Sequence, residues 1–168
     1  GRILITPQKT EPRGAVLPCG ESGSTLRFLL PVCGALGTEG RFVMEGRLPE
    51  RPMHLYEELL CAHGMHIRHS GAELHFSGQL TPGEYRLAGD VSSQYFSGLL
   101  MALPLLDSSS TIEASGSLES APYVRLTEDA LSLAGVRFTK PSAARWEVPG
   151  RQAFALPSSL SAEGDWSN

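Results

Sequence analysis

The sequence of 168 residues predicts an α/β protein built from repeated units of strand, helix, strand, helix and two strands. A short phrase of Gly, an acidic residue and Ser is written three times, beginning at Gly20, Gly89 and Gly164. Each copy closes a strand-like stretch, and the first two copies open a helix-like one. Landmarks between the copies recur at a spacing of roughly 70 residues, which favours tandem structural units over a short solenoid repeat.

Each unit is expected to contain two helices. Small polar residues before an apolar run cap the free backbone N–H groups of the run, so helices should follow the first two phrases. Amphipathic segments further on predict the second helix of each unit, and Gly64 and Gly135 stand where a C-terminal cap belongs. The expected helices are residues 24–36, 53–60, 94–106 and 124–133.

Two strands with a turn between them should follow each of these glycines, because apolar and polar residues alternate there. The expected strands are residues 65–68 and 73–76 in the first unit, and 136–139 and 145–148 in the second. We expect one domain over residues 1–168, with tandem units at about 16–88 and 89–163 and the start of a further segment at 164–168. Trp146 and Trp166 are expected to be packing residues.

The ends of the chain suggest a fragment. The third phrase has no helix after it, and Gly1 begins directly in a strand-like run without an initiator Met. A processed mature protein is the alternative.

Composition narrows the classes of partner. The net charge is −4 and no run of Lys and Arg is present, which argues against binding to nucleic acid or to an anionic membrane. An anionic small molecule, by contrast, needs only a few local cations. No apolar stretch reaches the length of a membrane span. Three cysteines without metal-ligand spacing fit a reducing compartment, so we expect a cytoplasmic protein.

Neither a metal site nor a reactive cysteine is expected. His63, His66 and His69 are three residues apart, but a glycine separates the first from the other two, which fall on a strand. They should therefore not converge on a metal. Cys61 has no cationic partner in the sequence near it and is expected to be a small buried apolar residue.

The strongest local signal for binding is the run Ser92-Ser93-Gln94. It offers two hydroxyls, an amide and free backbone N–H groups at one helix start, a density of donors that suits phosphate. Ordinary helix capping, which needs a single hydroxyl, is the alternative. The matching position of the second helix in this unit carries Ser120 and Tyr123 beside a proline.

The first unit offers cations at the equivalent places. Gly23 would let a ligand approach the backbone, and Arg27 lies one turn into the helix. Arg51 stands between two prolines ahead of the second helix, where a cation opposes the helix dipole unless an anion compensates it. Pairing of Arg51 with Glu50 or Glu57 is the alternative.

These motifs together resemble the enolpyruvyl transferase family, and within it the 5-enolpyruvylshikimate-3-phosphate synthases. They stand in family order over nearly the whole chain: residues 21–27, 50–52, 89–95 and 120–123. The resemblance implies a protein of two globular domains, each an inside-out α/β barrel of three βαβαββ units with helices inside an outer layer of sheets. This chain would then be most of one substrate-binding domain.

The resemblance also implies a reaction of the shikimate pathway, which leads to chorismate and the aromatic amino acids. The enolpyruvyl group of phosphoenolpyruvate passes to the 5-hydroxyl of shikimate 3-phosphate through a tetrahedral intermediate, and phosphate leaves. No cofactor is implied. By position, the residues expected to hold shikimate 3-phosphate are Ser92, Ser93, Gln94, Ser120 and Tyr123. Those expected on the phosphoenolpyruvate side are Gly23, Arg27, Arg51 and Gln94.

Two departures from the family pattern matter. Glu21 stands where many members have Asn, and the family's Lys-Ser motif is absent, as are the proton-transfer residues of the other domain. We therefore expect the chain alone to fold without turning over, the missing domain of the same protein being its partner. Alternatives are a UDP-N-acetylglucosamine enolpyruvyl transferase, a non-catalytic phosphometabolite-binding domain and a purely structural repeat protein.

Overall fold

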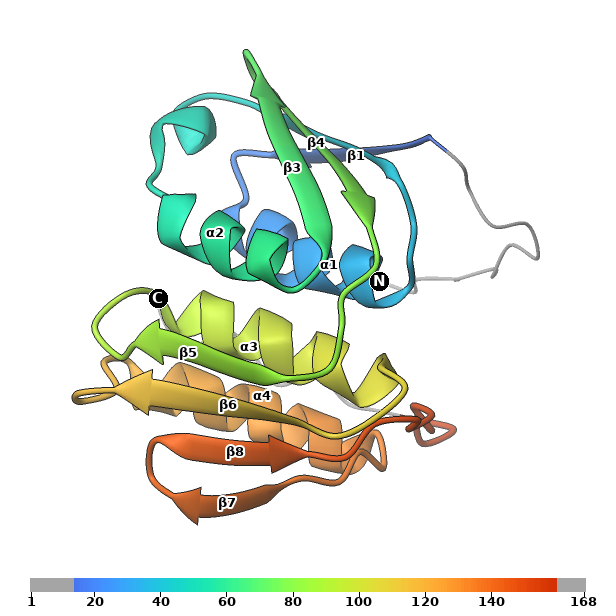
Figure 1. The fold of residues 1–168 in the computed structure, drawn as a ribbon, viewed down its shortest axis with the longest axis vertical. Helices are drawn as coiled ribbons and strands as arrows, with labels where there is room; N and C mark the ends of the chain where they lie inside the picture. Colours follow the sequence, from blue (N-terminus) through green and yellow to red (C-terminus); the bar gives the residue numbers. More distant parts are fainter. Residues whose placement is uncertain (1–13, 160–168) are drawn as a thin grey trace.

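The computed structural model describes residues 14–159 and contains two βαβαββ units in succession (Figure 1). The first unit comprises β1 (Ala15–Gly20), α1 (Gly23–Ala35), β2 (Gly40–Met44), the 3₁₀ turn η1 (Leu48–Glu50), α2 (His54–Ala62), β3 (Met65–Ser70) and β4 (Glu73–Gly78). The second comprises β5 (Glu84–Ala88), α3 (Ser93–Ala102), the 3₁₀ turn η2 (Leu103–Leu105), β6 (Ser110–Ser115), α4 (Ala121–Leu133), β7 (Thr139–Ser142) and β8 (Arg145–Val148). The predicted α/β class is confirmed. The third phrase, Gly1 and Trp166 lie outside the described residues.

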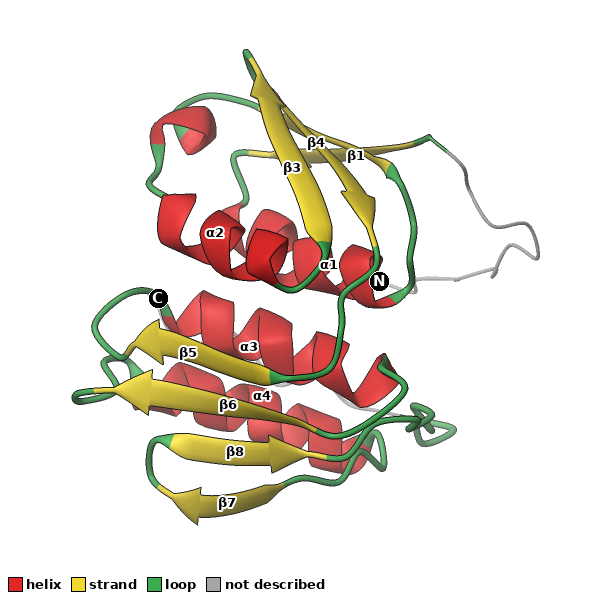
Figure 2. Cartoon of the chain, in the orientation of Figure 1, coloured by secondary structure: helices red, strands yellow, loops and turns green. Residues whose placement is uncertain are grey.

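Each unit forms its own four-stranded sheet, in the orders β1-β2-β4-β3 and β5-β6-β8-β7. The first two strands of each unit are parallel, and such pairs need a crossover, which α1 and α3 provide. The helices lie inward and the sheets lie outward, with α1 packed directly on α3 (Figure 2). The strand at 84–88, which the sequence analysis grouped with residues 16–88, pairs with β6 and so belongs to the second sheet.

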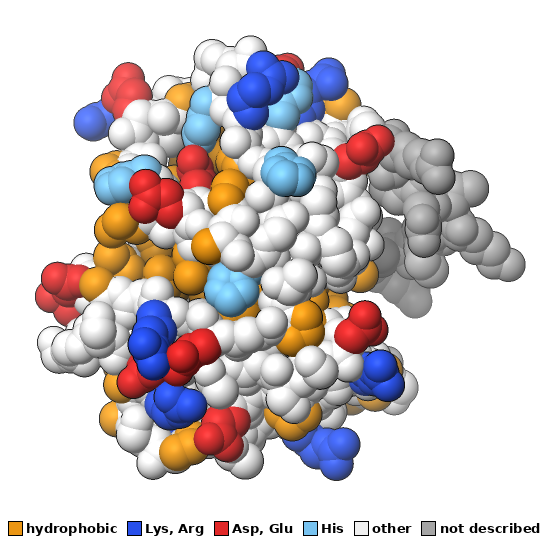
Figure 3. All heavy atoms as spheres, viewed as in Figure 1, with side chains coloured by type: hydrophobic (Ala, Val, Ile, Leu, Met, Phe, Trp, Pro, Cys, Tyr) orange, Lys and Arg blue, Asp and Glu red, His pale blue; other side chains and the backbone are white. Residues whose placement is uncertain are grey.

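Apolar side chains from helices and sheets fill one continuous core. Trp146 of β8 is fully buried, as predicted, and its indole N–H donates to a carboxylate oxygen of Glu128 on α4 at 2.7 Å. This bond fastens the last hairpin to the helix layer. The space-filling view shows charged side chains of both signs scattered over the outer sheets, and apolar side chains gathered where the two units meet (Figure 3).

Two of the differences between predicted and observed bounds have a clear physical cause. The helix expected over 94–106 ends at Ala102, because Pro104 has no N–H to continue the helical ladder and the chain turns into η2. The strand expected at 136–139 begins only at Thr139. The N–H and C=O of Arg137 bond instead to the side chain of Gln152, at 2.8 and 2.9 Å, and so do not enter the sheet.

The expectation that Cys61 is buried is wrong. Helix α2 turns Tyr56 and Leu60 into the core, and Cys61, one residue further round the helix, is exposed. The two glycines predicted to end helices are confirmed. Gly64 and Gly135 follow α2 and α4 at φ angles of 100° and 76°, which favour glycine.

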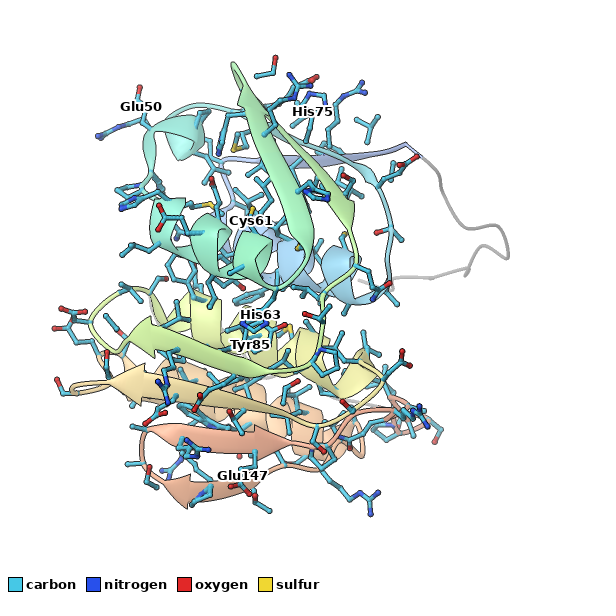
Figure 4. All side chains as sticks on the ribbon, in the orientation of Figure 1. Glu50, Cys61, His63, His75, Tyr85 and Glu147 are labelled. Atoms are coloured by element: carbon cyan, nitrogen blue, oxygen red, sulfur yellow. The ribbon has the colours of Figure 1, made fainter. Side chains whose placement is uncertain are left out.

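His63 lies at the junction of the two units, where its ring stacks on Tyr85 with centroids 3.8 Å apart (Figure 4). Burial lowers the pKa of His63 from its ordinary value, and backbone hydrogen bonds oppose this shift. The folded protein thus binds fewer protons at His63 than the unfolded chain does. Stability should therefore fall as the pH drops below about 6.5, the ordinary histidine pKa, towards the lower folded value.

Thermal unfolding of wild type and His63→Gln at pH 7.5 and 5.5 checks this effect. We expect the loss of Tm on acidification to be smaller in His63→Gln, because the other histidines contribute equally to both proteins. An equal loss of Tm in the two proteins would contradict the account.

Candidate functional site

A pocket of about 620 Å³ opens where α1, α3 and α4 begin. All five residues expected to hold shikimate 3-phosphate line it, and Arg27 lines it as well. Its lining residues within 14–159 are Ser24, Arg27, Phe28, Ser92, Ser93, Gln94, Ser97, Met101, Ser120, Tyr123, Leu126, Thr127 and Ala130. Arg27 and Gln94, which are 67 residues apart in the sequence, therefore lie side by side in this pocket.

One serine of the pocket caps a helix, and two others have hydroxyls that are free to donate. Ser92 is the N-cap of α3 and accepts a hydrogen bond from the N–H of Gln94 at 3.3 Å. Within residues 14–159, no hydrogen-bond partner is found for the hydroxyls of Ser93 and Ser120. Ser120 precedes α4 at φ 55° without capping that helix through its side chain. Capping thus accounts for one hydroxyl and leaves two available to a ligand.

The loops that carry these serines are tied together by the backbone. Gly89 donates its N–H to the carbonyl of Ser115 at 2.8 Å and accepts from the N–H of Glu119 at 2.9 Å. A Cβ at Gly89 would collide with the carbonyl of Ser117, so this approach requires glycine. The start of α3 and the turn before α4 are consequently held in fixed relation.

Buried polar contacts under the pocket join the same two helices. The hydroxyls of Ser97 on α3 and Thr127 on α4 lie 2.7 Å apart, and both side chains are buried. Because each hydroxyl satisfies the other, the pair costs little to bury. It fixes α4 against α3 in the wall of the pocket.

Three of the four residues expected on the phosphoenolpyruvate side, Gly23, Arg27 and Arg51, converge beside this pocket. A Cβ placed on Gly23 would lie 3.2 Å from Nη1 of Arg27 and 3.3 Å from Nη1 of Arg51. Arg27 also donates from Nη1 to the side-chain oxygen of Gln94 at 2.8 Å. Gln94, which lines the serine pocket, thus joins Arg27 of the arginine pair to that pocket.

Neither arginine is paired with a carboxylate of the described residues. The alternative partners expected for Arg51 are engaged elsewhere: Glu50 lies 3.8 Å from Arg47, and Glu57 lies 2.9 Å from His69. Nε of Arg27 is buried and has no hydrogen-bond partner in residues 14–159. Two uncompensated guanidinium groups at one point make a strong site for a phosphate or carboxylate.

Glu21 packs on the turn at Gly46, where a Cβ would collide with its carboxylate. The N-cap of α1 is the next residue, Ser22, which accepts from the N–H of Thr25 at 3.2 Å. Glu21 therefore neither caps the helix nor appears among the residues that line the pocket.

Sequence reasoning missed the buried residues that support the site, chiefly Tyr56 and Tyr95. A signal for one of them existed: Pro31 stands four residues after Arg27 in an expected helix. Proline has no N–H, so the carbonyl of Arg27 needs another donor, which the hydroxyl of Tyr56 supplies at 3.3 Å.

Other features of residues 14–159 do not form a comparable site. No group of three metal-ligating side chains is found there, and His63 stacks on Tyr85 whereas His69 pairs with Glu57. A second hollow of about 490 Å³ lies on the outer face of the first sheet, where Arg41 and His75 both pair with Glu73. No helix in this part of the chain is long and apolar enough to cross a membrane.

Comparisons with known proteins find relatives of this chain. The 3-phosphoshikimate 1-carboxyvinyltransferase of Brachyspira hyodysenteriae is 37% identical over 166 residues, which are 99% of this chain and 39% of that protein. The protein of the same name from Clostridium kluyveri is 40% identical over 151 residues, 89% of this chain and 35% of that protein. The chain thus spans less than half the length of these curated relatives.

Structural comparison supports the fold, and a family model supports the membership. The EPSP synthase of Acinetobacter baumannii superposes with a TM-score of 0.71 at 20% identity, over 84% of this chain and 32% of that one. The family model described as EPSP synthase (3-phosphoshikimate 1-carboxyvinyltransferase) matches residues 2–168. On this match and these identities, the chain belongs to the EPSP synthase family.

Proposed function

We propose that this chain is the substrate-binding part of an enzyme that transfers the enolpyruvyl group of phosphoenolpyruvate to the 5-hydroxyl of shikimate 3-phosphate. The observation that carries the proposal is the meeting of the serine pocket with the pair Arg27 and Arg51, joined through Gln94. Both substrates are anions, and the two halves of the site offer different donors for them. The three free cysteines fit a cytoplasmic enzyme.

Shikimate 3-phosphate is assigned to the pocket. The free hydroxyls of Ser93 and Ser120 and the backbone N–H groups at the start of α3 are donors for its phosphate, and the dipole of that helix adds to the attraction. Gln94 can donate its amide N–H₂ while its oxygen accepts from Arg27. Tyr123 is 63% exposed at the rim, where its ring can cover the carbocycle.

Phosphoenolpyruvate is assigned to the two arginines. The absence of a side chain at Gly23 leaves room for an anion against both guanidinium groups. During transfer, the 5-hydroxyl of shikimate 3-phosphate loses its proton as its oxygen bonds to C2 of phosphoenolpyruvate, and C3 takes up a proton as the C2–C3 double bond opens. The tetrahedral intermediate then loses a proton from C3 as the C2–O bond to phosphate breaks. Fixed cations stabilise the charge that collects on the departing phosphate.

The proposal assigns the proton transfers to the second domain of a longer protein. None of the pocket-lining side chains within residues 14–159 is a carboxylate, imidazole or amine. Exposed leucines on α4, on α1 and directly after α1 also favour a covering partner: Leu29, Leu36, Leu126 and Leu133. Closure of the two domains would exclude water from the substrates.

Phosphate release by the full-length protein tests the proposal. With phosphoenolpyruvate and shikimate 3-phosphate together we expect stoichiometric phosphate and enolpyruvyl product, and with either substrate alone we expect none. Release with UDP-N-acetylglucosamine in place of shikimate 3-phosphate would assign the sister activity. Binding of shikimate 3-phosphate without any release would show a non-catalytic binding protein and overturn the proposal.

A further inference from the structure

Two tyrosines are stacked between the helices that carry the site. Tyr56 of α2 is fully buried and Tyr95 of α3 is 5% exposed. Their ring centroids are 4.2 Å apart and the rings are 13° from parallel. Neither residue is assigned a substrate contact above, yet each one contacts backbone next to an arginine of the site.

The hydroxyl of Tyr56 fixes the turn of α1 that bears Arg27. It lies 3.3 Å from the carbonyl oxygen of Arg27 and 3.4 Å from that of Tyr95, so its single proton serves the two acceptors. The carbonyl of Arg27 is free to accept because Pro31 lacks the N–H that would bond to it. Through this contact α2 fixes the position of the Arg27 backbone relative to α3.

Tyr95 contacts Arg27 and the residue that follows Arg51. Its hydroxyl donates to the carbonyl oxygen of Pro52 at 2.9 Å, directly after Arg51 in the chain. The guanidinium carbon of Arg27 lies 5.4 Å from the centre of the Tyr95 ring, within the range of a cation–π contact. One side chain thus holds the segment of Arg51 by its hydroxyl and the head group of Arg27 by its ring.

Such support matters because the arginines repel each other. Both guanidinium groups approach Gly23, and neither has a carboxylate partner among the described residues. Without support, like charges would move apart into solvent and would have to be drawn together again by each incoming anion. Holding both arginines in place removes that cost from ligand binding.

We propose that Tyr95 is a positioning residue for the phosphoenolpyruvate side of the site, acting on Arg51 through its hydroxyl and on Arg27 through its ring. The inference rests on the proposed function for the identity of the ligand. The hydroxyl of Tyr95 should therefore affect the binding of phosphoenolpyruvate and of phosphate, and no other binding. The acceptor of this hydroxyl, Pro52, does not line the serine pocket, so binding in that pocket should not respond to loss of the hydroxyl.

Tyr95→Phe in the full-length protein tests this role, because it keeps the ring and removes only the bond to Pro52. We expect KM for phosphoenolpyruvate to rise about 3- to 10-fold, the usual net worth of one hydrogen bond, and KM for shikimate 3-phosphate to change less than two-fold. Tyr85→Phe is the matched control. Tyr85 is also buried and donates at 2.7 Å to the carbonyl of Thr81, a residue that neither lines the pocket nor adjoins Arg27 or Arg51 in the chain.

A double variant separates positioning from general loosening. If Tyr95 acts through Arg51, then Tyr95→Phe should add little to the KM change of Arg51→Ala, whereas independent effects would add. The same proteins titrated with inorganic phosphate give a readout that needs no turnover, and Tyr95→Phe should again bind about 3- to 10-fold more weakly than wild type.

The outcomes distinguish this inference from the proposed function. Normal turnover with equal effects of Tyr95→Phe and Tyr85→Phe, or full additivity with Arg51→Ala, would overturn the positioning role alone. No turnover by wild type, with phosphate binding still weakened by Tyr95→Phe, would overturn the proposed function and retain the positioning role. Wild type that binds no phosphate would overturn both.

Discussion

Arg51→Ala is expected to lower kcat/KM for phosphoenolpyruvate by roughly 10²- to 10³-fold in the full-length protein. The charged head of Arg51 faces Gly23 beside Arg27 and is paired with no carboxylate of the described residues, so its charge is available to a ligand. A two-pronged contact between guanidinium and phosphate or carboxylate contributes about 3–4 kcal/mol, which corresponds to this range. Binding of shikimate 3-phosphate should change less than two-fold.

Steady-state kinetics with each substrate varied in turn measure the effect. Arg47→Ala is the matched control, because Arg47 is an exposed arginine four residues earlier whose nearest carboxylate is 3.8 Å away. Its removal should leave both KM values unchanged. Arg51→Lys keeps the charge but loses the planar guanidinium group. Its kcat/KM for phosphoenolpyruvate should lie between the values of wild type and Arg51→Ala. If Arg51→Ala behaves like Arg47→Ala, the assignment of Arg51 is wrong.

Gly98→Ala is expected to destabilise the protein by about 2–3 kcal/mol, although alanine normally stabilises a helix relative to glycine. Gly98 lies where α3 crosses α1. A Cβ there would collide with the carbonyl oxygen of Arg27 and lie 2.7 Å from the hydroxyl oxygen of Tyr56. The backbone of Arg27 cannot yield as a flexible side chain would, so the two helices must separate.

Urea unfolding followed by circular dichroism gives the free energy of unfolding for wild type and variant. Asp129→Ala provides the ordinary effect of alanine in a helix, because Asp129 is exposed on α4, and it should be neutral or slightly stabilising. Gly98→Ala should also raise KM for phosphoenolpyruvate by displacing Arg27. A variant as stable as wild type would contradict the close packing of α1 on α3.

Local features of the sequence predicted most of the fold. The helix starts, Gly64 and Gly135 depend on neighbours in the chain, so capping rules place them well. The strand expected at 136–139 begins later in the structure, because the side chain of Gln152, which is distant in sequence, forms hydrogen bonds with the backbone of Arg137. Cys61 is exposed, against expectation, because burial depends on which face of α2 packs on the core, and that face carries Tyr56 and Leu60.

The candidate site was predictable only in part for the same reason. Ser93, Ser120 and Arg51 were found because each stands at a helix start beside a polar run or a proline. That the two units bring these starts together is set by the packing of α1 on α3, which no local pattern contains. The stacking of Tyr56 on Tyr95 follows from that packing, whereas the sequence shows only that Pro31 leaves the carbonyl of Arg27 in need of another donor.

Calorimetric titration of the full-length protein with shikimate 3-phosphate tests the central claim, that the serine pocket binds the phosphorylated acceptor while the arginines serve phosphoenolpyruvate. We expect Ser93→Ala to bind shikimate 3-phosphate about 10-fold more weakly than wild type, since a hydrogen bond to a charged group is lost, and Arg51→Ala to bind it nearly as wild type does. Unchanged affinity in Ser93→Ala, or an equal loss in Arg51→Ala, would contradict the account.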